Sequence, residues 1–480
     1  MTVGPGSVGT PSWREARRAG LGRPAGSSTA RAAVVGTLIA VVLMGVVALL
    51  DYHLNQPLHR VAKVLLAASL GVGILIKPLV GLFIFPVLAP FLPWIPPVPV
   101  PGINAINLLL GGVFTTWAIS RAISHQTIFR PARLGVLILC LLGLAALSIV
   151  RGGAFPTGYT YDAMASSVEL FRSTVTLGVY FVALSMVRGP RDRKWFAWAI
   201  VLGLLAEAAI TIAYGRTGRG SRAVGSIGQS NDLGTFLAIY SVFAAALLPG
   251  VRNIFGKLVL VAGVLLGGYA TVLSVSRAAI VAFGIGLLYV GLRSSKVLTL
   301  VLIVGAITSP LWAPDYLKER MLGTQKAVEG TDEAELESGA QERVDTWRAL
   351  ATLVEDHPLD GVGFSGLEYV LPQTGEELGL EVKDSSHNTY LRTLAEMGIF
   401  GLMLFCLLLW NCWRLGSDAA RASVSRFDRQ IGVGVAGATV ALALSCAFGD
   451  RFFNPVISSG FWIACALAND ILIERREASP

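Results

Sequence analysis

The chain has 480 residues, of which 54% are hydrophobic and only 15% are charged, whereas soluble domains carry about 25% charged residues. Its apolar runs are long and continuous, which excludes a barrel built from short alternating strands. The net charge of +8 is spread over short connectors, so it does not indicate nucleic-acid binding. We therefore predict an all-α polytopic membrane protein with about 12–14 transmembrane helices.

Residues 1–30 are rich in Gly, Ser, Pro and Arg, and we expect a disordered, basic cytoplasmic tail there. Transmembrane helices are expected over 31–313 and over 395–473, followed by a cytoplasmic tail at 474–480. Arginines recur in alternate connectors, which places both termini inside by the positive-inside rule. The expected spans lie near 31–50, 60–76, 78–95, 103–120, 134–150, 171–187, 195–214, 231–249, 258–275, 278–292, 297–313, 395–413, 430–448 and 456–473.

One large loop, 314–394, falls on the outer face in this topology. It carries 7 Lys and Arg against 17 Asp and Glu, a balance of 7 − 17 = −10. Its apolar residues repeat at helical spacing over 341–356, which predicts a helix with Trp347 in its packed face. A second helix is expected over 367–371. The loop is therefore expected to be extracytoplasmic, partly helical and able to cover a membrane cavity.

Arginines on the outer side oppose the orientation that the positive-inside rule favours. The connector 215–230 carries Arg216, Arg219 and Arg222, and Arg277 lies at the outer end of a span. These misplaced arginines indicate a functional site. Arg343 lies on the same side in the large loop, although a loop of this length translocates regardless of its charge.

The stretch 385–404, SSHNTYLRTLAEMGIFGLML, passes from polar to apolar and enters a span. His387 and Asn388 therefore lie on the outer side, just ahead of the membrane. We expect Ser385 or Ser386 to cap the helix that starts here. His387 becomes the candidate proton acceptor of the site.

Arginines and a histidine on one face suit a particular chemistry. Guanidinium groups bind phosphate oxygens in pairs and stabilise a diphosphate leaving group. Imidazole titrates near neutral pH and can take the proton of an attacking hydroxyl. These residues therefore favour attack on a sugar carbon that carries a lipid diphosphate. No DxD or HExxH pattern accompanies them, so we expect neither a metal nor another cofactor.

Four motifs carry a resemblance to a known family. They are RAVGSIGQSNDLGTFL (222–237), LSVSRAA (273–279), RVDTWRALATLVEDHPLDGVGFSGLEYV (343–370) and HNTYLRTLAEMGIFGLMLF (387–405). In this order and spacing, with the large loop before the last spans, the chain resembles the O-antigen ligase / O-antigen polymerase superfamily of bacterial envelope glycosyltransferases. It departs from that pattern at QSNDLG (229–234), where many relatives have a proline before the Asn and an Ala after it.

The resemblance implies a donor glycan carried on undecaprenyl diphosphate at the outer face of the cytoplasmic membrane. It implies that Arg222, Arg277 and Arg343 bind the diphosphate and that His387 activates the acceptor hydroxyl, supported by Asn231 and Asn388. The acceptor would be a glycan or a glycolipid. A composition of 31 Arg against 8 Lys is typical of GC-rich bacteria that lack lipopolysaccharide, which favours polymerisation over ligation.

The same residues also allow other functions and other roles. The whole chain could be a lipid-linked glycan flippase or transporter, although no internal repeat of the kind found in transporters is visible. Arg222 could be an ordinary basic loop residue, and Arg277 a snorkelling span end. Arg343 could pair with an acidic neighbour in its loop. We expect Arg392 and Glu396 to face water. Five outer residues are lesser candidates for the site: Tyr159, Tyr161, Asp162, Asp450 and Arg451.

Overall fold

The computed structural model describes residues 78–94, 105–123, 125, 129–154, 161–216, 222–312, 325–327, 334–336, 338–380, 382 and 385–478. The chain divides into two compact units, 1–81 and 82–480. Only four residues of the first unit are described, so the account below concerns the second. The expected tail at 1–30 and the expected spans at 31–50 and 60–76 lie outside the described residues.

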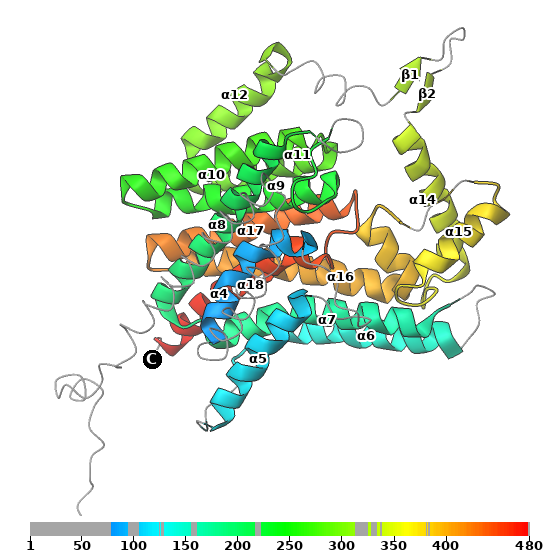
Figure 1. Ribbon diagram of the computed structural model, residues 1–480, viewed down its shortest axis with the longest axis horizontal. Coiled ribbons are helices and arrows are strands. Elements are labelled where there is room, and N and C mark those ends of the chain that lie inside the picture. The colour runs from blue at the N-terminus through cyan, green and yellow to red at the C-terminus, as the bar shows by residue number, and fades with distance from the viewer. Residues whose placement is uncertain are drawn as a thin grey trace, which may run out of the picture. The chain divides into compact units, whose positions relative to one another are not determined.

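The elements appear in chain order in Figure 1. They are α4 (Pro78–Leu88), the 3-10 helix η1 (Ala89–Trp94), α5 (Ala105–Ile123), α6 (Gly135–Ala154), α7 (Ala163–Met186), α8 (Gly189–Tyr214), α9 (Ser230–Leu247), the 3-10 helix η2 (Leu248–Gly250), α10 (Ile254–Leu273), α11 (Arg277–Ser294), α12 (Lys296–Trp312), β1 (Gln325–Ala327), β2 (Ala334–Leu336), α14 (Ser338–Asp356), α15 (Leu367–Glu377), α16 (Thr389–Ala422), α17 (Arg426–Cys446) and α18 (Pro455–Glu477). The two short strands pair antiparallel within the large loop.

The fold is that of an all-α polytopic membrane protein, as the sequence predicts. Within the described part of the chain, nine helices are long and apolar enough to cross a membrane: α6 to α11 and α16 to α18. Every expected span in that part coincides with a helix. Several helices extend beyond the expected spans: α7 begins at Ala163 rather than 171, α8 begins at Gly189 rather than 195, α16 runs over Thr389–Ala422 rather than 395–413, and α18 continues through Glu477, into the expected tail.

The helices α9, α17 and α18 are the most fully buried of these spans. Helices α10 and α11 pack against α9, while α16 packs against α17 and α18 (Figure 1). By contrast, α6 and α10 expose large apolar side chains such as Leu139, Leu147, Leu258 and Leu265. Exposed leucines along a helix of this length are expected where lipid, rather than water, is the solvent.

A buried ion cluster joins three helices at the end opposite the candidate site. Arg193, near the start of α8, is 1% exposed and contacts Asp428 of α17 at 2.9 Å, Asp470 of α18 at 2.6 Å and Glu474 of α18 at 2.6 Å. Arg130 also reaches Asp470, at 2.5 Å. A buried arginine is tolerated because several carboxylates satisfy its donors together, and removing one partner of such a pair is strongly destabilising.

Helix α16 is broken at Gly398, where the backbone has φ 65° and ψ −168°. The backbone N–H groups of the 358–363 segment fill the break: two of them donate to the carbonyls of Ala395 and Glu396 at 2.8 and 3.1 Å. Only glycine fits at the break, because an added Cβ would lie 2.0 Å from the carbonyl oxygen of Leu359. The loop backbone is thereby joined to the start of a membrane helix.

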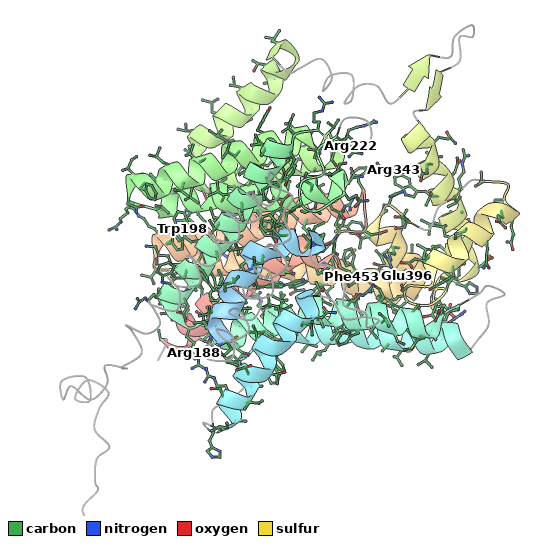
Figure 2. All side chains as sticks on the ribbon, in the orientation of Figure 1. Arg188, Trp198, Arg222, Arg343, Glu396 and Phe453 are labelled. Atoms are coloured by element: carbon green, nitrogen blue, oxygen red, sulfur yellow. The ribbon has the colours of Figure 1, made fainter. Side chains whose placement is uncertain are left out.

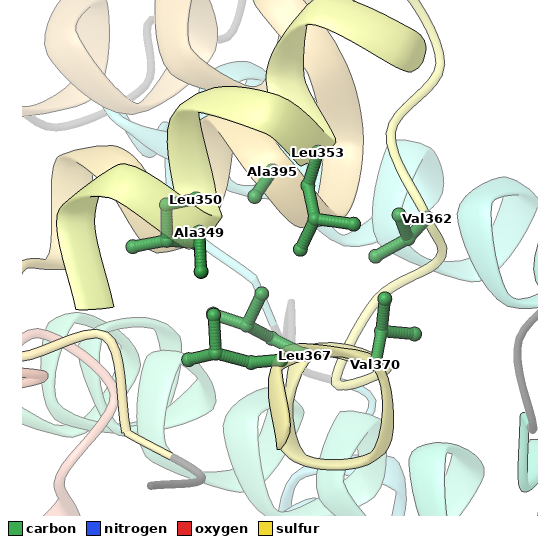
Figure 3. Packing of buried hydrophobic residues seen from close by; sticks show 8 residues of the cluster. Ala349, Leu350, Leu353, Val362, Leu367, Val370 and Ala395 are labelled. Carbon is green, nitrogen blue, oxygen red and sulfur yellow. The ribbon is translucent and has the colours of Figure 1, made fainter. Parts of the chain in front are cut away.

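The large loop has its own apolar core, which continues onto α16 (Figure 3). Its members come from α14, from the segment before α15, from α15 itself and from α16: Ala349, Leu350, Leu353, Val362, Leu367, Val370, Leu371 and Ala395. Trp347 packs against this cluster, as expected for a residue on the packed face of the loop helix. The expected helices at 341–356 and 367–371 are both present, the first starting three residues earlier and the second running on to Glu377.

Replacing Gly398 by alanine is expected to separate the loop from α16, because the new methyl group collides with the Leu359 carbonyl. Overpacking of this kind costs about 1–3 kcal/mol. Limited proteolysis of the purified protein should then cleave the loop faster than in the wild type. Gly284→Ala, at an open position of α11, is the matched control. Equal cleavage of Gly398→Ala and wild type would contradict this role of the break.

Candidate functional site

Arg222 is held at the corner between α10 and α11. Its Nε donates to the carbonyl oxygen of Ser274 at 3.0 Å, and its Nη2 donates to the Asn231 side chain at 2.6 Å. Asn231 lies in the first turn of α9. The corner itself is strained, because Val275, a β-branched residue, has a φ of 52°. Strained backbone of this kind costs on the order of 1–3 kcal/mol and is concentrated at functional sites.

Arg277 follows this corner directly as the first residue of α11. It lies close enough to Arg343, on α14 of the loop, for the two charges to interact. Burial and repulsion from Arg277 lower the pKa of Arg343 below its usual value, and the neighbouring Glu342 partly offsets this effect. Asp345 is not the partner that compensates Arg343, because its carboxylate binds Arg348 and Gln341. Two like charges held together favour an anion as ligand.

His387 lies in the turn just before α16, with a left-handed φ of 51°. Its side chain is 29% exposed, and its Nε2 is 4.0 Å from Oε1 of Glu342. Its Nδ1 is 3.4 Å from Oγ of Ser385. The residue that caps α16 is Asn388, whose side-chain oxygen accepts from the N–H groups of Tyr390 and Leu391, so the expectation of a cap at Ser385 or Ser386 is wrong.

The serines before His387 are instead fixed by Asp450, in the connector between α17 and α18. Oγ of Ser385 donates to Asp450 at 3.3 Å, and Oγ of Ser386 donates to it at 2.8 Å. Trp347 of α14 donates its indole N–H to the Ser386 carbonyl at 3.2 Å. The turn that carries His387 is therefore held from both the loop and the last membrane helices.

Arg451 links the His387 turn to the Arg222 corner. Its backbone N–H donates to Oγ1 of Thr389 at 3.2 Å, and its guanidinium pairs with Asp232 at the start of α9. Its charge also interacts with that of Arg222. The sequence singles out Arg451 only as a lesser candidate, because its position beside α9 depends on the packing of α9 against α17 and α18.

Contacts and charge interactions connect these residues. Glu342 contacts His387, and Arg343, the next residue of the loop, interacts through its charge with Arg277. The charge of Arg222 interacts with that of Arg451, whose backbone N–H donates to Thr389 close to His387. Figure 2 shows Arg222 and Arg343 at the same end of the helices. The structure therefore brings together residues from five distant parts of the chain.

One expectation about nearby charges is wrong. Glu396 is 2% exposed, and it does not face water but accepts from Nε of Arg392 at 3.0 Å. It is buried because the 358–363 segment covers this part of α16. Arg392 and Glu396 lie in the first turns of α16, directly after the His387 turn. There, Nη1 of Arg392 is 4.0 Å from Asp450.

Two lesser candidates have structural roles. Tyr161 donates its hydroxyl to the Phe364 carbonyl at 2.9 Å, and its ring fills the space left by the glycines of the 360–366 turn. Asp162 caps α7 by accepting from the Ala165 N–H. Among the residues that the structure describes, no three His, Cys, Asp or Glu side chains are grouped as metal ligands.

Comparison with known proteins shows a similarity over part of the chain. Residues 262–406 match the O-antigen ligase family model, a range that includes Arg277, Arg343 and His387. A Rickettsia prowazekii (strain Madrid E) protein provisionally named a polysaccharide ligase is 27% identical over 128 residues. That alignment covers 24% of this chain and 28% of the relative.

Among solved structures, a chain from work on the coordination of polymerisation and crosslinking by a peptidoglycan synthase complex is similar with a TM-score of 0.39 and 16% identity. The match covers 72% of this chain and 98% of that one, and at this score it supports no conclusion. The family model, over residues 262–406, and the Rickettsia relative together confirm the resemblance seen in the four sequence motifs: in this part the chain is similar to the O-antigen ligase / O-antigen polymerase superfamily.

Proposed function

We propose that this protein is a membrane glycosyltransferase that moves a glycan from a lipid diphosphate to an acceptor hydroxyl. The observation that carries the proposal is the grouping of His387 beside Glu342, of Arg343 within charge interaction of Arg277, and of Arg222 at the corner before α11. Burial lowers the pKa of Arg343 most, and repulsion from Arg277 lowers it further. A diphosphate would relieve that repulsion, and its two phosphates offer enough oxygens for several guanidinium groups.

The proposed reaction is a direct displacement. A ring nitrogen of His387 takes the proton of the acceptor hydroxyl, while the hydroxyl oxygen forms a bond to the anomeric carbon of the donor sugar. The bond from that carbon to the diphosphate oxygen breaks, and the electron pair leaves with the diphosphate. Arg222, Arg277 and Arg343 stabilise the charge that develops on it. Glu342, 4.0 Å from His387, stabilises the imidazolium that forms.

The donor we propose is an undecaprenyl-diphosphate-linked oligosaccharide, used at the outer face of the cytoplasmic membrane. The positive-inside pattern supports that face, because it places the 314–394 loop outside. The acceptor we favour is a second lipid-linked repeat, which makes the reaction a polymerisation. The covering loop, held to α16 by the 358–363 segment, supports a site that admits two substrates and excludes water.

His387→Asn is expected to lower transfer by about 10²–10⁴-fold, the usual contribution of a general base. Asparagine accepts the left-handed backbone of this position, so the fold should persist. The assay is extension of a purified lipid-diphosphate repeat unit, with donor binding measured in parallel and expected to stay within about twofold of wild type. His125→Asn, at another left-handed histidine, is the matched control.

Unchanged transfer in His387→Asn would remove His387 from the reaction. A different result would support a transporter. In that case the lipid would cross vesicle membranes equally fast with wild type and with His387→Asn, and no variant would extend the glycan chain.

Arg277→Lys is expected to weaken donor binding and transfer about tenfold or more, because lysine keeps the charge but not the paired N–H geometry. The same change at the exposed Arg252 should have no effect. The measurements are the apparent affinity for undecaprenyl diphosphate and the initial rate of transfer. Wild-type values for both in Arg277→Lys would exclude Arg277 from the diphosphate site.

A further inference from the structure

A second group of arginines surrounds a pocket of about 320 Å³ between α11, α16 and α17. Its lining is three arginines, a tyrosine, two serines and three small apolar residues: Arg293, Arg421, Arg429, Tyr289, Ser417, Ser423, Ala420, Val433 and Ala436. No carboxylate is among these lining residues, all of which belong to the part of the chain that the structure describes. The pocket combines positive charge, hydroxyl groups and an apolar wall.

This pocket is separate from the candidate active site. Arg293 follows Arg277 by 16 residues along α11, which is about 24 Å at 1.5 Å per residue. Arg421 is likewise at the end of α16 remote from His387, and Arg429 is at the start of α17, whose other end leads to Arg451. The three helices pack side by side (Figure 1), so the pocket opens at the opposite membrane face.

Side-chain contacts fix the shape of the pocket. The guanidinium of Arg293 lies 5.6 Å from the centre of the Tyr289 ring. The Tyr289 hydroxyl is 3.4 Å from Oγ of Ser417 and accepts from the Trp413 indole at 3.1 Å. Arg421 pairs with Asp418, which lies outside the pocket lining. Arg293 and Arg421 therefore each have a contact within their own helix, beside the hydroxyls of Tyr289 and Ser417.

The depth of the pocket favours a lipid over a soluble ion. Trp410 and Trp413 stack with their centroids 4.8 Å apart, and Trp410 is 54% exposed. Tryptophans are enriched at the level of lipid headgroups, so these two mark the boundary of the membrane. Met403 and Leu407, on the preceding turns of α16, are also exposed and would face acyl chains. Arg421 of the pocket follows Trp413 by eight residues along α16, which is just over two turns.

We infer that this pocket binds the phosphate group of an anionic glycerophospholipid on the face opposite the active site. Arg293 and Arg429 bind the phosphate oxygens, the hydroxyls of Tyr289 and Ser417 contact the headgroup, and the apolar wall takes the first atoms of the acyl chains. One lipid molecule in this place would bridge α11 to α16 and α17.

The test is lipid binding to the full-length protein in detergent, followed by native mass spectrometry. Phosphatidylglycerol and phosphatidylcholine with the same acyl chains are titrated separately. Wild type should retain one phosphatidylglycerol molecule in preference to phosphatidylcholine. The double variant Arg293→Gln/Arg429→Gln should lose about tenfold or more in affinity for phosphatidylglycerol.

The matched control is Arg414→Gln/Arg426→Gln, which removes two exposed arginines of α16 and α17 outside the pocket. It should bind phosphatidylglycerol like wild type. Because exposed residues contribute little to fold stability, these substitutions should leave the fold intact. Arg429→Gln alone should lose less affinity for phosphatidylglycerol than the double variant.

Three results would overturn the inference. One is equal retention of phosphatidylglycerol and phosphatidylcholine by wild type. Another is an equal loss of affinity for phosphatidylglycerol in the control double variant and in the pocket double variant. The third is displacement of phosphatidylglycerol by inorganic phosphate at an equal concentration, which would show a site for the free ion. None of these measurements uses glycan transfer, so the outcome is independent of the proposed enzymatic activity.

Discussion

The break in α16 at Gly398 is the constraint on which the rest of the candidate site depends. Backbone carbonyls freed inside a membrane protein must find partners, because lipid offers none. Here the 358–363 segment supplies two N–H groups, and Ser148 donates its hydroxyl to the Glu396 carbonyl at 2.8 Å. The satisfied break joins the loop helices to the membrane helices. It also brings α14 beside the turn that carries His387.

At least one charge of the site is held in place before any substrate arrives. Arg222 is fixed by Ser274 and Asn231, while Arg277 and Arg343 repel each other. The backbone is strained at both Val275 and His387. Fixed cations of this kind stabilise developing negative charge without reorganising during the reaction. Packing between helices offsets the repulsion between the two arginines. Because a diphosphate would relieve this repulsion, we assign the diphosphate of the proposed donor to this place.

Patterns within single segments predicted much of this structure. The apolar runs marked the helices, the spacing around Trp347 marked the loop helix, and arginines on the disfavoured side marked Arg222 and Arg277, whereas Arg343 was marked by its family motif. Features that depend on distant segments were not predictable. Glu396 looked solvated because the segment that buries it precedes it by more than 30 residues. The cap at Asn388 was missed because Asp450, 62 residues further on, takes the serines that could have filled that role.

The most direct test of the account is a cryo-electron microscopy structure of the purified protein with undecaprenyl diphosphate bound. The account predicts diphosphate oxygens within hydrogen-bond distance of Arg222, Arg277 and Arg343, with His387 facing the side from which the acceptor would attack. Density for the diphosphate away from these arginines, with the loop in its present position, would contradict the central claim that His387 and the arginines act on one substrate.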